Sequence, residues 1–162
     1  MKIALGSDHR GDMVTSDLLL YLKTQGHEPF TFGSCDGETC DYPDEAWHVA
    51  KAVSEGEADR GILACGSGIG MSIAANKVSG IRAALVFDEI SAGRSRRHND
   101  ANVLCLSPEM TPLDQIRKIV DVWLEEEFEG GRHAQRVAKI TAIEQGKDPT
   151  AIKNETTEAS TT

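Results

Sequence analysis

The sequence predicts an α/β protein in which helices cover both faces of a parallel sheet. Short apolar runs alternate with longer segments whose apolar residues recur at helical spacing, and this alternation is typical of parallel sheets. The central apolar run, at 61–65, passes directly into a glycine-rich turn and then into helix-forming residues. Of the chain, 40% is hydrophobic and only 5% aromatic, which favours an aliphatic core between the layers.

The expected strands are short, and polar or glycine-rich segments separate each strand from the next element. They are residues 2–7, 27–32, 61–65, 81–87 and 102–106. A polar loop is expected at 33–41.

The expected helices lie between these strands and after the last one. Leu18 and Leu22, Val49 and Val53, and Ile116 and Ile119 mark the apolar faces of three of them. The helices are expected from Asp12 to near Gly26, from Pro43 to near Gly56, after the glycine turn to Lys77, at 88–97, at 113–128, and from Arg132 to near Gln145.

One domain, residues 1–146, accounts for nearly all of the 162 residues, a length sufficient for a full core. From Lys147 onward the chain has few apolar residues and many threonines, which predicts a disordered C-terminal tail over 147–162. The sequence is therefore expected to form a single domain followed by a short tail.

The net charge of −9 argues against a nucleic-acid surface, because a phosphate backbone requires a basic face. A small phosphate remains compatible with it, since a few local arginines suffice. No apolar run approaches the roughly 20 residues that span a bilayer, and the apolar N-terminus is too short for a signal peptide. We therefore expect a cytoplasmic protein with no membrane partner.

The four cysteines are Cys35, Cys40, Cys65 and Cys105, and in the cytoplasm they are expected to be reduced. Cys35 and Cys40 could bind zinc or form a regulatory disulfide, but no second pair of ligands accompanies them. Neither alternative is favoured.

The segment Cys65-Gly66-Ser67-Gly68-Ile69-Gly70 is the strongest candidate site. A strand–turn–helix unit directs backbone N–H groups at one point, and a thiol there can have a lowered pKa. The glycine spacing matches neither the dinucleotide fingerprint nor the P-loop. The same residues also fit a plain turn beside a small buried thiol, so the motif alone leaves both interpretations open.

Further polar residues lie close to the expected strand ends. Asp8 and His9 follow the first strand and should share a sheet edge with Cys65. His98 and Asn99 precede the fifth strand and are expected to border the same edge or the helices beside it.

Two groups of arginines lie on expected helices. Arg132 and Arg136 share a helix face and suit either a phosphate clamp or an ordinary pair of surface residues. The other group, Arg94, Arg96 and Arg97, is typical of a solvated helix face.

Six motifs taken together resemble the type B ribose-5-phosphate isomerases, a family that includes the galactose-6-phosphate isomerase subunits. The resemblance extends over about residues 2–145. It implies a Rossmann-like three-layer α/β/α sandwich with a five-stranded parallel sheet, and a homodimer or tetramer with active sites at the subunit interface. It also implies a phosphorylated sugar as substrate and no metal or organic cofactor. The motifs are Gly6-Ser7-Asp8-His9, Asp41-Tyr42-Pro43, Cys65-Gly66-Ser67-Gly68-Ile69-Gly70, Ala74-Ala75-Asn76-Lys77, His98-Asn99 and Gly130-Gly131-Arg132-His133-x-x-Arg136.

The resemblance also implies a role for each matching residue in aldose–ketose isomerisation, a reaction that requires a base, an oxyanion site and an acid/base for ring opening. Cys65 resembles the base that moves a proton between C1 and C2 of the sugar. Ser67 and the amides of Gly66, Gly68, Ile69 and Gly70 resemble the site for the enediolate oxygens. His98 matches the residue that opens the sugar ring, Asp8 and Tyr42 lie beside the sugar, and Asn99 holds its reacting end. His9, Arg132 and Arg136 match the phosphate-binding positions.

One position departs from the family pattern. The family usually has an arginine shortly after the fifth strand, and Glu109 occupies that place here. We expect Pro108 to turn the loop so that Glu109 lies away from the phosphate or contacts a sugar hydroxyl. Ribose 5-phosphate is the favoured substrate, and the alternatives are a tetrose or hexose phosphate, a non-catalytic sugar-phosphate-binding subunit, and a thiol redox enzyme that uses Cys65.

Overall fold

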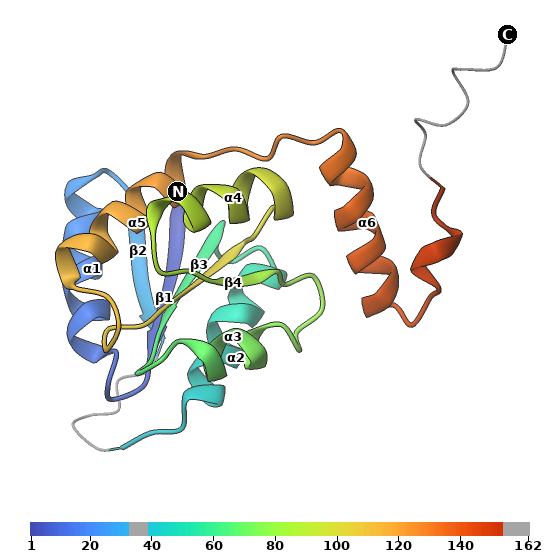
Figure 1. The fold of residues 1–162 in the computed structure, drawn as a ribbon. Coiled ribbons are helices and arrows are strands. Elements are labelled where there is room, and N and C mark those ends of the chain that lie inside the picture. Colours follow the sequence, from blue (N-terminus) through green and yellow to red (C-terminus); the bar gives the residue numbers. More distant parts are fainter. Residues whose placement is uncertain (33–38, 154–162) are drawn as a thin grey trace, which may run out of the picture.

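In the computed structural model, which describes residues 1–32 and 39–153, the strands form one parallel sheet (Figure 1). The strands are β1 (Lys2–Ser7), β2 (Glu28–Phe32), β3 (Arg60–Ala64), β4 (Ala83–Leu85) and β5 (Val103–Leu106). Their order across the sheet is β2-β1-β3-β5-β4, and every neighbouring pair is parallel. The predicted five-stranded parallel sheet is confirmed.

Each predicted helix is present. The helices are α1 (Asp12–Thr24), α2 (Tyr42–Ser54), α3 (Ile69–Ala75), α4 (Glu89–Asn99), α5 (Leu113–Glu125) and α6 (Arg132–Glu144), followed by the 3₁₀ turn η1 (Pro149–Ala151). Helix α2 begins one residue before the predicted Pro43, and α4 continues two residues beyond the predicted 88–97. Strand β4 is shorter than the predicted 81–87, because two asparagine side chains accept the hydrogen bonds of its first amides. Asn102 Oδ1 accepts from the N–H of Arg82 at 2.8 Å, and Asn76 Oδ1 accepts from that of Ala83 at 2.9 Å.

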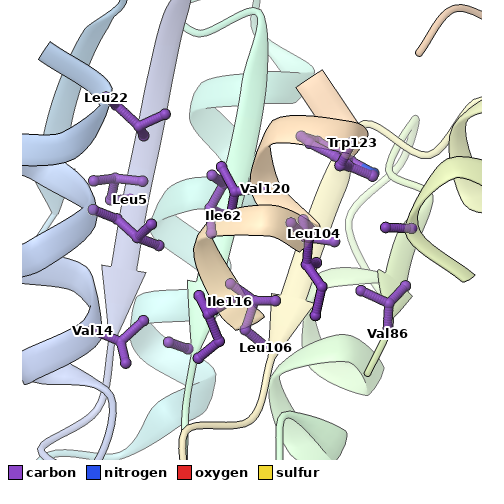
Figure 2. Close-up of a cluster of buried hydrophobic side chains, with 14 of the residues drawn as sticks. Leu5, Val14, Leu22, Ile62, Val86, Leu104, Leu106, Ile116, Val120 and Trp123 are labelled. Atoms are coloured by element: carbon purple, nitrogen blue, oxygen red, sulfur yellow. The ribbon is translucent and has the colours of Figure 1, made fainter. Parts of the chain in front are cut away.

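Helices α1, α4 and α5 cover one face of the sheet. Successive residues of a strand point to opposite faces, and Ile3 and Leu5 of β1 belong to the core on this side. Figure 2 shows Leu22 of α1 and Ile116, Val120 and Trp123 of α5 around the same cluster. Because these side chains are almost fully buried, this face is closed to solvent.

Helices α2 and α3 cover the opposite face. Ala4, Leu63 and Cys105 point to this side and pack with Val49 of α2 and Met71 of α3. Burial on both faces explains why the strands are continuous apolar runs rather than alternating ones. The predicted three-layer, Rossmann-like architecture is confirmed.

Helix α6 lies beyond the β4 side of the sheet, reached by a segment that crosses over from α5 (Figure 1). That segment is fixed to α4, because the N–H of Glu129 donates to the carbonyl of Arg97 at 3.0 Å. Glu144, at the other end of α6, accepts from the N–H of Gly80 at 2.8 Å. Residues 147–153, which we assigned to the tail, include η1, and η1 contacts α6.

The predicted 33–41 loop and 147–162 tail both extend beyond the described residues. Within residues 1–32 and 39–153, no helix has the length and apolar content needed to cross a bilayer.

Candidate active site

The carboxyl ends of β1, β3 and β5 form one row, because Ser7 pairs with Ala64 and Ala64 pairs with Leu106. The next residue on β1 is Asp8, and the next on β3 is Cys65, so both leave the sheet at the same edge. From β1 the chain adds β2 on one side and then returns to add β3 on the other. Open α/β sheets form their ligand crevice at such a reversal of strand order.

A tight turn follows Cys65 and leads into α3. Gly68 has φ +72°, and its N–H donates to the carbonyl of Cys65 at 3.2 Å. A Cβ on Gly68 would lie 2.5 Å from Cδ1 of Leu85, so a larger residue would meet both backbone strain and a steric clash.

Two of the amides expected to bind the enediolate already have partners within the turn. The N–H of Gly68 donates to the carbonyl of Cys65, and the N–H of Ile69 donates to Oγ of Ser67 at 3.4 Å. No described residue accepts a hydrogen bond from the N–H of Gly66, Ser67 or Gly70. The donors that remain for a developing negative charge are therefore these three amides and the Ser67 hydroxyl.

Two free thiols, Cys65 and Cys105, lie in the same buried cluster. Burial raises the pKa of Cys105, and a charge on Cys65 would raise it further. Cys105 therefore stays protonated, and Cys65, at the sheet edge, is the thiol placed to exchange a proton. Cys105 thus lies near Cys65 in space although it is distant in sequence, which bears on the alternative of a thiol redox enzyme. The raised pKa of Cys105 opposes fast exchange between the two thiols.

Cys40 is disulfide-bonded, so the expectation of four reduced cysteines is wrong for this residue. Cys35 lies outside the described residues.

Tyr42, at the start of α2, packs over the glycine turn. A Cβ on Gly70 would lie 2.5 Å from the Tyr42 ring, so the ring and the turn approach as closely as a glycine allows. The buried Asp8 accepts the N–H groups of Arg10 and Gly11 through Oδ1, at 2.9 and 3.1 Å. Asp8, exposed His9, Tyr42, Cys65 and Ser67 all belong to segments at the carboxyl edge.

Glu109 contacts a residue that the sequence analysis did not single out. Its carboxylate forms an ion pair with the guanidinium of Arg10, and both side chains lie against Gly66. The opposite charges of Arg10 and Glu109 were the available signal, but nothing in the sequence alone placed them together.

His98 and Asn99 lie at the opposite edge of the sheet. Helix α4 runs back between two parallel strands, so its last residues lie beside the beginning of β5. Asn102 there accepts from the N–H of Gly61 and donates its own N–H to Arg82, both at strand beginnings. Of the two expected placements, at the carboxyl ends or in a helix beside them, the first is therefore wrong, because a crossover helix such as α4 ends at the amino edge.

The end of α4 is held by Asp100, which adopts φ +47°. Its carboxylate accepts from Arg96 Nη1 at 2.9 Å and from Arg82 Nη2 at 2.8 Å. Arg96 is buried, which contradicts its assignment to a solvated face. These contacts fix the backbone that presents His98 and Asn99.

The start of α6 brings His133 against His98 and places Arg132 and Arg136 near His133. The His133 ring stacks on that of His98 with centroids 4.3 Å apart and planes 2° from parallel. Burial lowers the pKa of His133, and the positive charges of His98, Arg132 and Arg136 lower it further. Arg132 and Arg136 are exposed and have no ion-pair partner in the described part of the chain.

Glu129, which was not expected at the site from the sequence, completes a cluster with His98 and His133. Its Oε2 lies 3.9 Å from His98 Nε2 and 3.5 Å from His133 Nε2, and one ligand atom of each residue lies within 4.8 Å of the others. The lone pair of each imidazole nitrogen lies in its own ring plane, and the two planes are separate and nearly parallel. The two rings therefore cannot both direct a lone pair at one ion at the usual distance of about 2.0–2.1 Å. The cluster is better suited to exchanging a proton than to holding a metal.

The predicted site residues therefore form two groups at opposite ends of the sheet. The carboxyl-edge group contains Cys65, Ser67, the turn glycines, Asp8, His9 and Tyr42, and the amino-edge group contains His98, Asn99, Arg132 and Arg136. A single chain does not bring the two groups together.

Comparison with known proteins gives a consistent result. Residues 3–140 match the family described as Ribose/Galactose Isomerase. The ribose-5-phosphate isomerase B of Escherichia coli is 48% identical over 147 residues, which cover 91% of this chain and 99% of that protein. The D-erythrulose-4-phosphate isomerase of Pectobacterium atrosepticum is 40% identical over 141 residues, with coverages of 86% and 93%.

A solved structure of ribose-5-phosphate isomerase B from Clostridium thermocellum has the same fold. It superposes with a TM-score of 0.89 at 51% identity, covering 90% of this chain and 99% of that one. With the fold, the turn after β3 and nearly the whole length in common, the chain belongs to the ribose/galactose isomerase family.

Proposed function

We propose that this isomerase interconverts ribose 5-phosphate and ribulose 5-phosphate as a homodimer, alone or paired into a tetramer. The observation that carries the proposal is the separation of the site residues into two groups at opposite edges of the sheet. A second copy can supply the missing group, so the carboxyl edge of one chain would face the amino edge of its partner. The names of the similar proteins support the substrate.

Exposed apolar side chains support a partner. Ile69 and Ile73 of α3 are exposed, as are Ile140 and Ile143 of α6. Large apolar residues grouped on exposed helices are typical of surfaces that another chain covers. Both helices border the proposed half-sites, α3 at the turn and α6 at the arginine pair.

In the proposed reaction, Cys65 removes the proton from C2 of the open-chain aldose and returns it to C1. The electrons of the broken C–H bond form the enediolate, whose oxygens accept from Ser67 and from the amides of Gly66 and Gly70. A second proton transfer between O1 and O2 leaves the carbonyl at C2. One base and one set of donors thus serve both directions of the reaction.

The partner chain would open the sugar ring. His98 of the partner subunit accepts the proton of the anomeric hydroxyl and supplies one to the ring oxygen, and Asn99 of the partner subunit holds the reacting end. The Glu129 carboxylate lies 3.9 Å from Nε2 of each His98. His9 binds the phosphate with Arg132 and Arg136 of the partner subunit, because guanidinium groups match phosphate geometry.

We infer a cytoplasmic location, because a charged sugar phosphate does not cross the apolar interior of a bilayer unaided and would remain in the compartment where it is made.

A substrate panel tests the proposed function. Purified protein is incubated separately with the aldose 4-, 5- and 6-phosphates erythrose 4-phosphate, ribose 5-phosphate and allose 6-phosphate, and formation of each ketose is followed. The highest kcat/KM is expected for ribose 5-phosphate. A clear preference for the tetrose, which the Pectobacterium relative's name makes the main alternative, would reassign the substrate. No turnover of any of them would favour a non-catalytic binding subunit.

A further inference from the structure

The carboxyl edge is acidic, although the proposed substrate is an anion. The described loops that leave the strand ends are residues 8–11, 39–41, 65–68, 86–88 and 107–112, and they contain the carboxylates of Asp8, Asp41, Asp88 and Glu109. Arg10 is the one lysine or arginine in these described loop residues. The described loops at this edge therefore offer a bound phosphate one permanent positive charge, that of Arg10.

The Arg10 side chain lies directly on the glycine turn. Its Nη1 donates to Oε1 of Glu109. A Cβ built on Gly66 would lie 3.0 Å from Cδ of Arg10 and 2.9 Å from Oε1 of Glu109. The ion pair therefore covers the residue between Cys65 and Ser67.

Buried anchors hold both partners of this pair. The Arg10 backbone N–H donates to Oδ1 of the buried Asp8 at 2.9 Å. On the other side, the buried Ser107 donates to the carbonyl of Gly66 at 2.6 Å and accepts from the N–H of Met110 at 3.2 Å. Both loops are thus tied to the turn, and the guanidinium is placed before any substrate arrives.

Stability does not account for this arrangement. The side chains of Arg10 and Glu109 are 59% and 50% exposed, and ion pairs with that much solvent contribute little to folding. A guanidinium has five N–H donors in a rigid fork. Glu109 takes one of these donors, and no other described residue accepts from the rest. Because the Arg10 side chain is more than half exposed, part of its guanidinium is accessible from solvent.

We propose that Arg10 binds the substrate phosphate and that Glu109 is a positioning residue that holds its guanidinium over Gly66. This inference rests on the proposed function and adds a phosphate ligand to it. The proposal also explains how an acidic residue can lie at this position. Arg10 neutralises the Glu109 charge, and Glu109 in turn orients the Arg10 guanidinium toward the phosphate. Glu109 is therefore compatible with a phosphorylated substrate.

Kinetics of Arg10 variants test the ligand. Turnover of ribose 5-phosphate by the wild-type protein is measured first, and its absence would reject the proposed function independently of Arg10. Given turnover, Arg10→Ala should raise KM about ten- to a hundredfold, the effect of losing one charged hydrogen bond, and change kcat little. Inhibition by inorganic phosphate should weaken by a similar factor, and Arg10→Lys should recover part of the loss. Lys23→Ala, which removes an exposed cation from α1 far from this edge, is the matched control.

An unchanged KM and an unchanged phosphate inhibition constant in Arg10→Ala would overturn the proposal. So would a lower KM, because it would mean that the ion pair blocks the site.

A double-mutant cycle tests the positioning role. Glu109→Gln should raise KM a few-fold when Arg10 is present and leave it unchanged in the Arg10→Ala background, because the effect acts through the guanidinium. If Glu109→Gln instead lowers KM by the same factor in both backgrounds, Glu109 repels the phosphate directly and the positioning role is wrong.

Discussion

At the scale of single residues, the two free cysteines show how burial separates similar groups. Cys65 is only 4% exposed, but it directly follows β3 and begins a turn whose N–H donors are in part unused by the described residues. Cys105 is fully enclosed, and burial raises its pKa. The same thiol chemistry is therefore available at the sheet edge and suppressed two residues deeper in the neighbouring strand.

Replacing the two thiols separately tests this distinction. Cys65→Ala should lower kcat at least about a hundredfold, as loss of a catalytic base does, while inorganic phosphate binding and the thermal midpoint change little. Cys105→Ala, a matched removal of one sulfur atom, should lower the thermal midpoint and keep kcat within a few-fold. Near-normal turnover by Cys65→Ala, measured by ketose formation, would exclude Cys65 as the base.

Removing the imidazole of His98 should affect cyclic substrates selectively. His98→Asn is expected to slow ribose 5-phosphate, which must open its ring, more than erythrose 4-phosphate, whose 4-hydroxyl is esterified by the phosphate and cannot close the same ring. The ratio of kcat/KM for the two sugars in variant and wild type measures the difference, provided that the wild type turns over both. Equal losses on the two would contradict a ring-opening role.

The sequence predicted the individual chemical groups better than their arrangement. Asp8 and Cys65 were correctly expected at one sheet edge, because each follows a strand directly. Arg10 and Glu129 were missed, and His133 was named in a motif but given no role. Their significance depends on distant partners, which are Glu109 for Arg10, 99 residues away, and His98 for Glu129 and His133, 31 and 35 residues away. Only the folded chain brings these pairs together.

At the scale of elements, α6 docks beside α4 rather than on either face of the sheet (Figure 1). His133 is the buried centre of this contact, stacked on His98. Neither nitrogen of His133 has a hydrogen-bond partner among the described residues, so the ring contributes as a flat surface rather than as a polar group. Protonation would place a charge there beside Arg132 and Arg136, with only Glu129 to compensate.

This environment predicts acid sensitivity with a defined sign. Burial lowers the pKa of His133 below its ordinary value of 6.5, so near and below pH 6.5 the unfolded chain binds more protons than the folded one. Stability from neutral His133 is thus fully present above pH 6.5 and is lost as the pH falls toward the lower folded value. His27, whose pKa burial also lowers, contributes in the same direction.

His133→Phe should reduce this sensitivity, because phenylalanine keeps a stacking ring, needs no hydrogen bond and cannot be protonated. Thermal midpoints measured between pH 7.5 and 5.5 should fall less for His133→Phe than for the wild type. His9→Phe, at an exposed histidine, is the matched control and should retain the wild-type slope. Parallel slopes for His133→Phe and wild type would show that His133 does not carry the effect.

The element types and order were predictable because apolar spacing and glycine turns are local signals. Of the two placements predicted for His98 and Asn99, the one at the carboxyl ends was wrong. Their position depends on the direction of α4, which follows from the parallel sheet rather than from the residues near them. The length of β4 was also overestimated, because Asn76 and Asn102 replace the ladder contacts at its start.

At the scale of the whole molecule, the sheet separates groups that the proposed reaction would require in one place. Its carboxyl edge carries the Cys65 thiol and the proposed oxyanion donors, and its amino edge carries the His98 imidazole and the arginine pair. Two copies related by a twofold axis would form two equivalent sites, each with Cys65 from one chain and His98 from the other. Most soluble homo-oligomers have such closed symmetry, so this arrangement needs no asymmetric contact.

Mixing two inactive variants tests the shared site directly. In a heterodimer of Cys65→Ala and His98→Asn chains, one site contains both substitutions and the other contains neither. Random exchange of subunits at equal concentrations yields about half heterodimers, so the mixture should regain about a quarter of wild-type activity. Each variant alone should stay inactive on ribose 5-phosphate, and wild-type protein carried through the same exchange is the control. If Cys65 and His98 of one chain formed the site, every site in the mixture would carry one lesion. Activity would then remain at the level of the separate variants even though size-exclusion chromatography and tagged-chain capture showed that the subunits had exchanged.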